Sequence, residues 1–344
     1  MDASLLIADR GGPAQPLLVA KDLRKHFPVG GGLLGRGRKV VRAVDDLTIS
    51  VAKGETLGVV GESGCGKSTV ARLLIRLIRP DRGSMVLDGD PIDEPHGISV
   101  NELRRQVQMV FQDSYASLNP RLTIGETLAF APKAHGVPAA EARARAHDLL
   151  AKVGLDPGSY AERYPHELSG GQRQRVNIAR ALALRPRLVI LDEAVSALDK
   201  SVEAQVLNML VDLKSEFGLT YVFISHDLNV VQYLSDRVLV MYLGKIVELG
   251  PAEAIYGNPL HPYTRALLSA RPSMDPRKRT REAPIQGDPP NPIDPPSGCR
   301  FRTRCPFAED VCVAREPLLA ETSAQSVACH MRRPGSGHSK AEAA

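Results

Sequence analysis

Gly61-Glu-Ser-Gly-Cys-Gly-Lys67-Ser68-Thr69 is the stretch of sequence that decides the fold. It fits the pattern G-x-x-x-x-G-K-[ST], follows the short apolar run 56–60, and precedes apolar residues at helical spacing. A buried strand, a glycine-rich loop and a helix are the context that a phosphate-binding loop requires. The sequence therefore predicts that this stretch binds the phosphates of a nucleotide.

The residue types in the loop match that chemistry. Glycines let successive backbone N–H groups face phosphate oxygens, and the helix that follows presents its positive end. Lys67 can reach the β- and γ-phosphates, and the Ser68 hydroxyl can ligate Mg²⁺. The plainer alternative is a chance glycine turn. The predicted nucleotide-binding residues of the loop are Gly61, Glu62, Ser63, Gly64, Cys65, Gly66, Lys67, Ser68 and Thr69.

Composition excludes several other classes of protein. The 344 residues suggest roughly two domains, and 43% hydrophobic with 24% charged residues is ordinary for a globular protein. Lysine and arginine number 44 against 39 acidic residues, and the resulting charge of +5 is too diluted to indicate nucleic-acid binding. No apolar run approaches the roughly 20 residues that span a bilayer, and no basic region precedes an apolar stretch at the N-terminus. The chain is expected in the cytosol, and any membrane attachment is expected to be peripheral.

Two carboxylates follow an apolar strand in Leu188-Val-Ile-Leu-Asp192-Glu193. In P-loop nucleoside triphosphatases (NTPases), a carboxylate at the end of a neighbouring strand holds the Mg²⁺ ion. Asp192 is therefore predicted to bind Mg²⁺, and Glu193 to act as the general base toward the attacking water. The plainer alternative is an acidic pair that caps the next helix.

Strand and helix patterns alternate along the rest of the chain. Strands are expected at 17–23, 40–51, 56–60, 106–111, 188–191, 220–224 and 237–242. Helices are expected from Lys67, through most of 123–153, and at 171–184, 201–216 and 228–234. This alternation predicts βαβ units and a mostly parallel sheet, with a helical insert inside an α/β core.

A third motif, Leu168-Ser169-Gly170-Gly171-Gln172, precedes the expected helix at 171–184. Ser169 can cap this helix, and the two glycines expose N–H groups at its start, which makes a second phosphate site. Alone, the motif is an ordinary helix cap. Together with the two motifs above, it resembles the LSGGQ signature of the ATP-binding cassette (ABC) ATPases. The resemblance implies that this signature contacts the ATP held by the partner subunit of a head-to-tail dimer.

Further positions match the family one by one. Gln112 resembles the Q-loop glutamine, which links the Mg²⁺ ion to the transmembrane partner, and Asp199 resembles the D-loop aspartate at the dimer seam. His226 resembles the switch histidine that binds the γ-phosphate, and Phe27 resembles the aromatic residue on which adenine stacks. Ala194 departs from the family, which usually has proline there; because no catalytic group is lost, activity is expected to persist.

The resemblance also implies a domain organisation. Residues 15–252 are expected to form an α/β P-loop ABC ATPase domain, with a mixed sheet core, an antiparallel β part and a helical signature subdomain at about 113–185. Residues 253–344 are expected to form a C-terminal extension of the oligopeptide-permease type, with a cysteine cluster at 299–329 and a disordered tail.

Other stretches narrow the resemblance to importers. The chain has a single cassette, no fused membrane spans and no long coiled coil. The stretches that carry the resemblance are Tyr164-Pro-His-Glu-Leu-Ser-Gly-Gly-Gln, Asn258-Pro-Leu-His-Pro-Tyr-Thr-Arg-Ala-Leu-Leu-Ser-Ala, Gly298-Cys-Arg-Phe, Arg304-Cys-Pro-Phe-Ala and Val327-Ala-Cys-His. Over about 17–331 the sequence is similar to ATP-binding subunits of dipeptide, oligopeptide and nickel permeases, and its N-terminal part resembles their second, F-type subunit.

This resemblance implies partners and a place in the cell. It implies a heterodimer with a second ABC ATPase subunit, two transmembrane permease subunits and an extracytoplasmic substrate-binding protein. The chain would lie on the cytoplasmic side of the inner (plasma) membrane, and ATP hydrolysis would power peptide import. Nickel or another small solute as cargo, a regulatory cassette without turnover, and a metal-sensing adaptor remain as alternatives; the intact Glu193 and His226 favour the hydrolysing motor.

Four cysteines gather near the C-terminus: Cys299, Cys305, Cys312 and Cys329. In a reducing compartment, such a group indicates a metal site before disulfides. Four thiolates suit both zinc and a [4Fe–4S] cluster, and His330 also allows a Cys₃His zinc site. The family resemblance favours a structural [4Fe–4S] cluster, with Zn²⁺ as the alternative.

Overall fold

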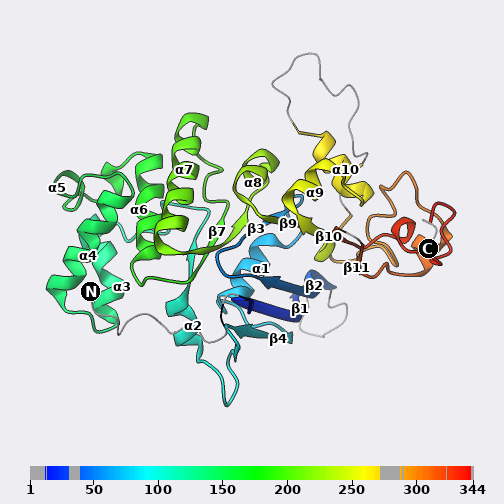
Figure 1. The fold of residues 1–344 in the computed structure, drawn as a ribbon, viewed down its shortest axis with the longest axis horizontal. Coiled ribbons are helices and arrows are strands. Elements are labelled where there is room, and N and C mark those ends of the chain that lie inside the picture. Colours follow the sequence, from blue (N-terminus) through cyan, green and yellow to red (C-terminus); the bar gives the residue numbers. More distant parts are fainter. Residues whose placement is uncertain are drawn as a thin grey trace. The chain divides into compact units, whose positions relative to one another are not determined.

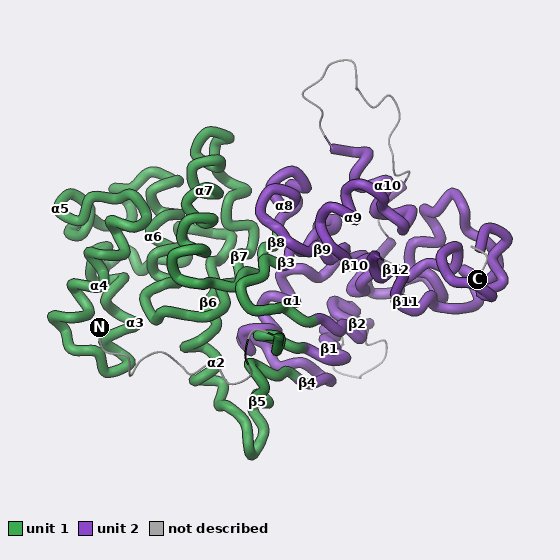
Figure 2. The backbone as a smooth tube through the Cα atoms, in the orientation of Figure 1, with its two compact units in different colours: residues 1–19, 50–56, 85–224 green, residues 20–49, 57–84, 225–344 purple. Residues whose placement is uncertain are grey.

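Figure 1 shows the computed structural model of the chain, which describes residues 12, 14–30, 39–271, 287–288, 290–322 and 324–341. The chain forms two compact units, which Figure 2 distinguishes by colour. Unit 1 comprises Met1–Val19, Ser50–Thr56 and Met85–Ile224, and unit 2 comprises Ala20–Ile49, Leu57–Ser84 and Ser225–Ala344. Each unit is therefore built from three separate segments of the sequence.

Three parallel strands form the sheet of unit 1. They are β6 (Val107–Val110), β7 (Leu188–Asp192) and β8 (Thr220–Ile224). Val110 lies opposite Leu191, and Asp192 lies opposite Ile224. Every residue of β7 and β8 is buried, as expected for parallel strands covered on both faces. Because these strands run in the same direction, the residues that follow them meet at one edge of the sheet.

Unit 1 also contains helices. They are α2 (Val100–Gln106), α3 (Ile124–Ala134), α4 (Ala139–Lys152), α5 (Pro157–Tyr160), α6 (Gly170–Leu182) and α7 (Lys200–Phe217). Of these, α2 and α6 contact strand β6. The helices α3, α4 and α6 pack on one another and form the predicted helical insert. The expected helical region 123–153 is divided in two, because Gly136 adopts a φ of 87° and Pro138 starts the next helix. Helix α2 was not predicted, although Ser99 and Glu102 form a capping box at its start.

Unit 2 contains a mixed set of strands. They are β1 (Leu18–Val29), β2 (Lys39–Val51), β3 (Thr56–Val60), β9 (Arg237–Tyr242), β10 (Lys245–Pro251), β11 (Ala320–Glu321) and β12 (Ser326–Val327). Strand β3 pairs with β9 in parallel, whereas β10 pairs antiparallel with both β9 and β12. In unit 1, β5 (Asp90–Pro91) pairs antiparallel with the end of β4 (Arg82–Leu87). Neither this pair nor β10 of unit 2 was predicted from the sequence.

The helices of unit 2 are short. They are α1 (Lys67–Leu74), α8 (Leu228–Leu234), α9 (Ala252–Gly257), α10 (Pro262–Ser269) and α11 (Asp310–Ala314), with 3₁₀ turns at Pro165–Glu167 in unit 1 and His330–Arg332 in unit 2. Within the described ranges of both units, no helix combines the length and the apolar character that crossing a bilayer needs.

Glu248 anchors the C-terminal extension to strand β10. Its side chain is fully buried and accepts hydrogen bonds from the backbone N–H groups of Leu260 (2.6 Å) and His261 (3.0 Å) and from the amide of Gln325 (3.0 Å). Burial raises the pKa of Glu248, although the hydrogen bonds from Leu260 and His261 act in the opposite direction. One carboxylate thus joins β10 to two later segments of the chain.

The composition of the tail after Arg333 predicts disorder. Within residues 334–341 most side chains are exposed, but two are buried. Ser336 and His338 are 6% and 5% exposed, and the His338 ring lies within hydrogen-bonding distance, 2.9 Å, of the Phe307 carbonyl. Buried polar contacts thus hold part of a segment whose sequence carries no periodicity.

Candidate functional site

The predicted phosphate loop connects β3 to α1 in unit 2. Gly61, Gly64 and Gly66 have φ angles of 150°, 78° and 112°. A Cβ atom at Gly66 would lie 2.1 Å from the carbonyl oxygen of Ala43, and one at Gly61 would lie 2.3 Å from that of Met241. These two positions therefore require glycine. Helix α1 begins after Gly66 without a side-chain cap, and its N-terminus presents the positive end of the helix dipole to the loop.

Lys67 lies inside this loop. Its side chain is buried, and its Nζ donates to the carbonyl oxygens of Gly61 (2.7 Å) and Glu62 (3.1 Å). Phosphate oxygens are stronger acceptors than these carbonyls, since they carry charge. Cys65 is also buried, which raises the pKa of its thiol and makes it a packing residue of the loop.

Gln112 and Glu193 meet at the carboxyl edge of the unit 1 sheet. The amide Nε2 of Gln112 donates to Oε2 of Glu193 at 2.8 Å. Glu193 has a φ of 50°, and its N–H donates to the carbonyl of Ile224 at 2.9 Å. A left-handed glutamate costs on the order of 1–2 kcal/mol, and such strain is found most often at functional sites. The structure thus brings together two of the predicted catalytic residues, beside the buried Asp192.

The signature motif forms a capped helix start in unit 1. Ser169 Oγ accepts from the N–H of Gln172 (3.3 Å), and the Gln172 side chain accepts from the N–H of Ser169 (2.9 Å). A Cβ atom at Gly171 would lie 2.5 Å from Val202, whereas the space around Gly170 is open. Ser169 and Gly170 are exposed, so the first N–H groups of α6 face outward.

The remaining predicted residues lie in both units. In unit 1, Asp199 is exposed and precedes α7 without a side-chain capping bond. In unit 2, the N–H of Ser225 donates to the Val59 carbonyl on β3 (3.3 Å), which places the next residue, the exposed His226, near the end of the strand that leads into the phosphate loop. Phe27 is half-buried on β1, and Lys25 Nζ lies 5.5 Å from its ring; its contact with adenine stays a prediction.

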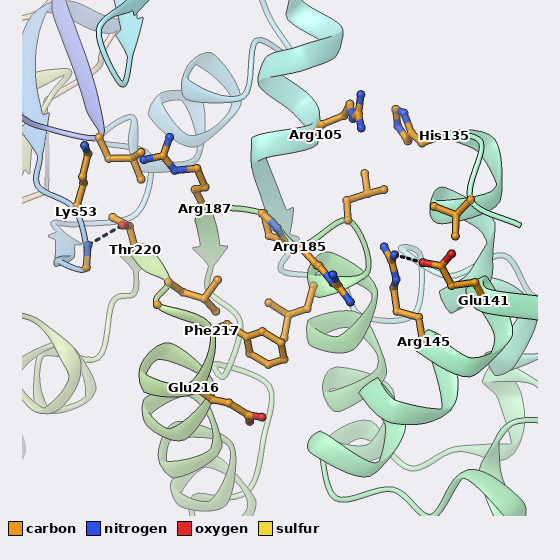
Figure 3. Close-up of a pocket in the computed structure, with 18 of the residues that line it drawn as sticks. Lys53, Arg105, His135, Glu141, Arg145, Arg185, Arg187, Glu216, Phe217 and Thr220 are labelled. Atoms are coloured by element: carbon orange, nitrogen blue, oxygen red, sulfur yellow. Dashed lines mark hydrogen bonds and ion pairs between the residues drawn. The ribbon is translucent and has the colours of Figure 1, made fainter. Parts of the chain in front are cut away.

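A basic cavity of about 730 Å³ lies at the opposite edge of the unit 1 sheet (Figure 3). Lys53 and Arg187 pair there with Asp88 at 2.8 and 2.7 Å, and Arg145 pairs with Glu141 at 2.9 Å. The cavity is lined by residues that precede β7 and β8, whereas Gln112 and Glu193 follow strands. Since ligands of parallel α/β sheets bind at the carboxyl ends of the strands, this cavity is not the nucleotide site.

The four C-terminal cysteines line one small cavity in unit 2, together with Phe301, Phe307 and His330. None of them forms a disulfide. Burial raises the pKa of Cys299 to about 12 and that of Cys329 to about 11. In the part of the chain that is described, no group of three or more His, Cys, Asp or Glu side chains is arranged to hold a metal ion.

His330 has an unused nitrogen beside these thiols. Its Nε2 lies 2.9 Å from the carbonyl oxygen of Arg315, which can only accept, so Nε2 carries the hydrogen. The Nδ1 atom is buried and has no hydrogen-bond partner among the described residues. An orphaned lone pair next to four thiols fits the chemistry of a metal-binding group.

Sequence reasoning missed two residues that contact the phosphate loop in unit 2. Tyr263 accepts a hydrogen bond from the N–H of Glu62 at 2.9 Å, and Arg304 pairs with the Glu62 carboxylate at 2.8 Å. Both belong to stretches that carry the family resemblance, but no pattern in the sequence indicates that they lie beside the loop.

Two family profiles match the chain. The ABC transporter profile matches residues 44–196, and the profile of the oligopeptide/dipeptide transporter C-terminal region matches residues 247–312. The second match covers strand β10 from residue 247, helices α9 and α10, and three of the four clustered cysteines.

Several curated proteins are similar over nearly the whole chain. The probable peptide ABC transporter ATP-binding protein y4tS of Sinorhizobium fredii is 52% identical over 92% of this chain and 90% of its own length. The oligopeptide transport ATP-binding protein AppF of Bacillus subtilis is 49% identical over 92% of this chain and 98% of its own. The di/tripeptide transport ATP-binding protein DppF of Pseudomonas aeruginosa is 47% identical, with the same two coverages of 92% and 98%. AppF and DppF carry the F-type designation expected from the sequence.

Solved structures share the fold. The protein cbiO1 from Clostridium perfringens, part of the ABC transporter complex cbiONQ, gives a TM-score of 0.60 at 26% identity, over 71% of this chain and 91% of that one. The ATP-binding cassette MJ0796, in a post-hydrolysis state with ADP and Pi, gives 0.59 at 27% identity, over 68% and 98%. The predicted α/β ABC fold is confirmed. The chain belongs to the ATP-binding proteins of ABC transporters, within the group that carries the oligopeptide/dipeptide transporter C-terminal region.

Proposed function

We propose that this chain binds and hydrolyses ATP to power the import of peptides through a membrane permease. The observation that carries the proposal is the hydrogen bond between Gln112 and Glu193, which pairs the predicted Q-loop residue with the predicted base. A cassette that only binds ATP does not need a positioned base. The names of relatives that match over 92% of the chain support peptides as the cargo.

The residues have distinct roles in this proposal. The loop from Gly61 to Thr69 cradles the phosphates, and Lys67 neutralises their charge. Ser68, Gln112 and Asp192 supply oxygen ligands of the type that Mg²⁺ prefers. A Mg²⁺ ion held by these residues would neutralise charge on the phosphates. The catalytic residues are Glu193 as the base, His226 as the γ-phosphate contact and Gln112; Phe27 stacks on adenine.

The signature residues Ser169, Gly170, Gly171 and Gln172, with Asp199, serve the ATP held mainly by the other subunit. The exposure of Ser169, Gly170 and Asp199 supports this role, since a site for a partner's nucleotide must face outward. We propose a heterodimer with a second ABC ATPase on the cytoplasmic side of the inner (plasma) membrane. It would bind two permease subunits, which receive peptide from an extracytoplasmic binding protein. Residues 15–252 form the ATPase domain and 253–344 the extension.

Co-purification tests these partners. The chain, tagged and expressed from its own locus, should be extracted from membranes by detergent together with two transmembrane proteins and a second ABC ATPase. Mass spectrometry and subunit ratios identify each one. Recovery of a homodimer without any membrane protein would contradict the proposed assembly, and a permease that binds nickel would contradict the peptide assignment.

The four cysteines are proposed to hold a [4Fe–4S] cluster with a structural role. All four line one cavity, which supports a shared group, and they are not arranged as ligands of a single metal ion. In a cluster, each thiolate binds a different iron, so the sulfur atoms need not converge on one point. Zn²⁺ remains the alternative, with His330 Nδ1 as a further donor.

Cys305→Ser is expected to lose the metal while the phosphate loop still binds ATP. Protein purified without oxygen should be brown and contain about four irons per chain, and the variant should be colourless. Cys65→Ser is the matched control, since this buried thiol does not line the cavity, and it should retain the iron. Stoichiometric zinc without iron would contradict the cluster but would still support the four cysteines as metal ligands. Absence of any metal would contradict both the cluster and the metal-ligand role.

A further inference from the structure

Glu62, the second residue of the phosphate loop, is held at three points within unit 2. Its carboxylate forms a two-pronged ion pair with the guanidinium of Arg304, at 2.8 and 3.0 Å. Its N–H donates to the hydroxyl of Tyr263 at 2.9 Å, and its carbonyl accepts from Lys67 at 3.1 Å. The side chain, the backbone N–H and the carbonyl of Glu62 therefore each have a hydrogen-bonding partner.

The two outer contacts come from the C-terminal extension. Tyr263 lies on α10, and Arg304 immediately precedes Cys305. Both side chains are firmly placed: Tyr263 is fully buried, and the side chain of Arg304 is only 6% exposed. Buried groups with a single available arrangement hold a partner more precisely than mobile surface groups do.

An aromatic cluster supports these contacts from behind. The ring of Tyr242 lies 4.7 Å from that of Tyr263 and 5.3 Å from that of Phe301, and the rings of Tyr263 and Phe301 are 5.4 Å apart. The guanidinium of Arg304 lies 6.0 Å from the Tyr242 ring and donates to its hydroxyl at 3.4 Å. The position of Arg304 is thus fixed by packing as well as by charge.

We propose that Arg304 and Tyr263 are positioning residues of the ATP site, which hold the phosphate loop in its binding conformation through Glu62. A carboxylate in a loop that receives polyphosphate is electrostatically unfavourable, and Arg304 offsets its charge. The Tyr263 hydroxyl accepts the hydrogen bond from the Glu62 N–H and so fixes the backbone at the start of the loop. The inference rests on ATP binding at this loop, which the experiment tests separately.

Arg304→Gln tests the electrostatic part. We expect the Kd for ATP to rise about tenfold, because the variant leaves the Glu62 carboxylate without its partner beside the phosphates. The turnover number at saturating ATP should change by less than about twofold, because no group that acts on the γ-phosphate is altered. Arg302→Gln is the matched control: this arginine donates to the carbonyl of Ser297 instead of the loop, and its variant should bind ATP as the wild type does.

A double variant separates positioning from general damage to the extension. Glu62→Gln combined with Arg304→Gln removes both charges, so it should bind ATP within about threefold of wild type. Tyr263→Phe should also weaken binding, because the N–H of Glu62 loses its acceptor. Iron or zinc content, measured on the same samples, should be unchanged in all of these variants.

The readout is titration of the assembled complex with ATP, with Lys67→Ala as the reference for a lost site. If the Lys67→Ala complex binds as many ATP molecules as the wild-type complex, and as tightly, nucleotide binding at this loop is refuted, and this inference with it. If Lys67→Ala removes one ATP per complex while Arg304→Gln binds like wild type, only the present inference is overturned. Loss of affinity in Arg304→Gln that the double variant does not restore, or that accompanies loss of metal, would also overturn it.

Discussion

Glu193→Gln is expected to bind ATP as the wild type does and to lose about 10²–10⁴-fold in turnover, the usual worth of a general base. The substitution keeps the shape of the side chain, and its amide oxygen can still accept the hydrogen bond that Gln112 now donates to Glu193 at 2.8 Å. What is lost is the basic carboxylate. The variant should therefore accumulate an ATP-bound dimer. Phosphate release by the assembled complex and retention of labelled ATP measure the two effects.

The matched control is Glu216→Gln, an exposed glutamate of the same unit whose partner is Lys152. It should hydrolyse ATP like the wild type, because surface ion pairs contribute little. Hydrolysis by Glu193→Gln within a factor of two of wild type would show that Glu193 is not the base.

Lys67→Ala is expected to weaken ATP binding by at least about 100-fold, because charge-assisted hydrogen bonds from a buried ammonium to phosphate are among the strongest polar contacts. Without nucleotide, its Nζ donates to the carbonyl oxygens of Gly61 and Glu62. Phosphate oxygens would replace these two acceptors when ATP binds. Equilibrium titration with labelled ATP measures the loss.

The control for this variant is Lys133→Ala, which removes an exposed ammonium from α3. The thermal unfolding midpoint of Lys67→Ala, measured without nucleotide, should stay close to that of wild type, so that lost binding reflects the site. Unchanged affinity for ATP in a folded Lys67→Ala protein would contradict ATP binding at the phosphate loop.

The parts of the fold that the sequence predicts are those with a local signal. Strands β3, β7 and β8 are continuous apolar runs between turn residues, and the structure buries all of their residues. The glycines at 61 and 66 were predicted from a motif, and their φ angles and close backbone neighbours explain why no other residue fits. Ser169 was predicted as a helix cap and forms a capping box.

The parts that escaped prediction depend on partners far away in the sequence. Arg304 and Glu62 are 242 residues apart, and Gln112 and Glu193 are 81 apart. Hydrophobic periodicity reports which face of an element is buried, but it does not report which distant side chain lies there. The assignment of Gln112 came from the family resemblance, and that of Arg304 only from the structure.

The tail illustrates the same limit. Its small and polar residues predict disorder, yet Ser336 donates to the His330 carbonyl (2.7 Å), and Glu309 accepts from the backbone N–H of Ser339 (2.8 Å). Each of these contacts is polar and specific, so composition cannot reveal it.

ATP-driven peptide uptake tests the central claim most directly. The complex that co-purifies with this chain is placed in liposomes that contain ATP and Mg²⁺, and the binding protein and labelled peptide are added outside. The account predicts uptake that requires internal ATP, that stops with Glu193→Gln in this chain, and that continues with Glu216→Gln. Equal uptake by the wild-type and Glu193→Gln complexes, or ATP turnover without any peptide accumulation, would contradict it.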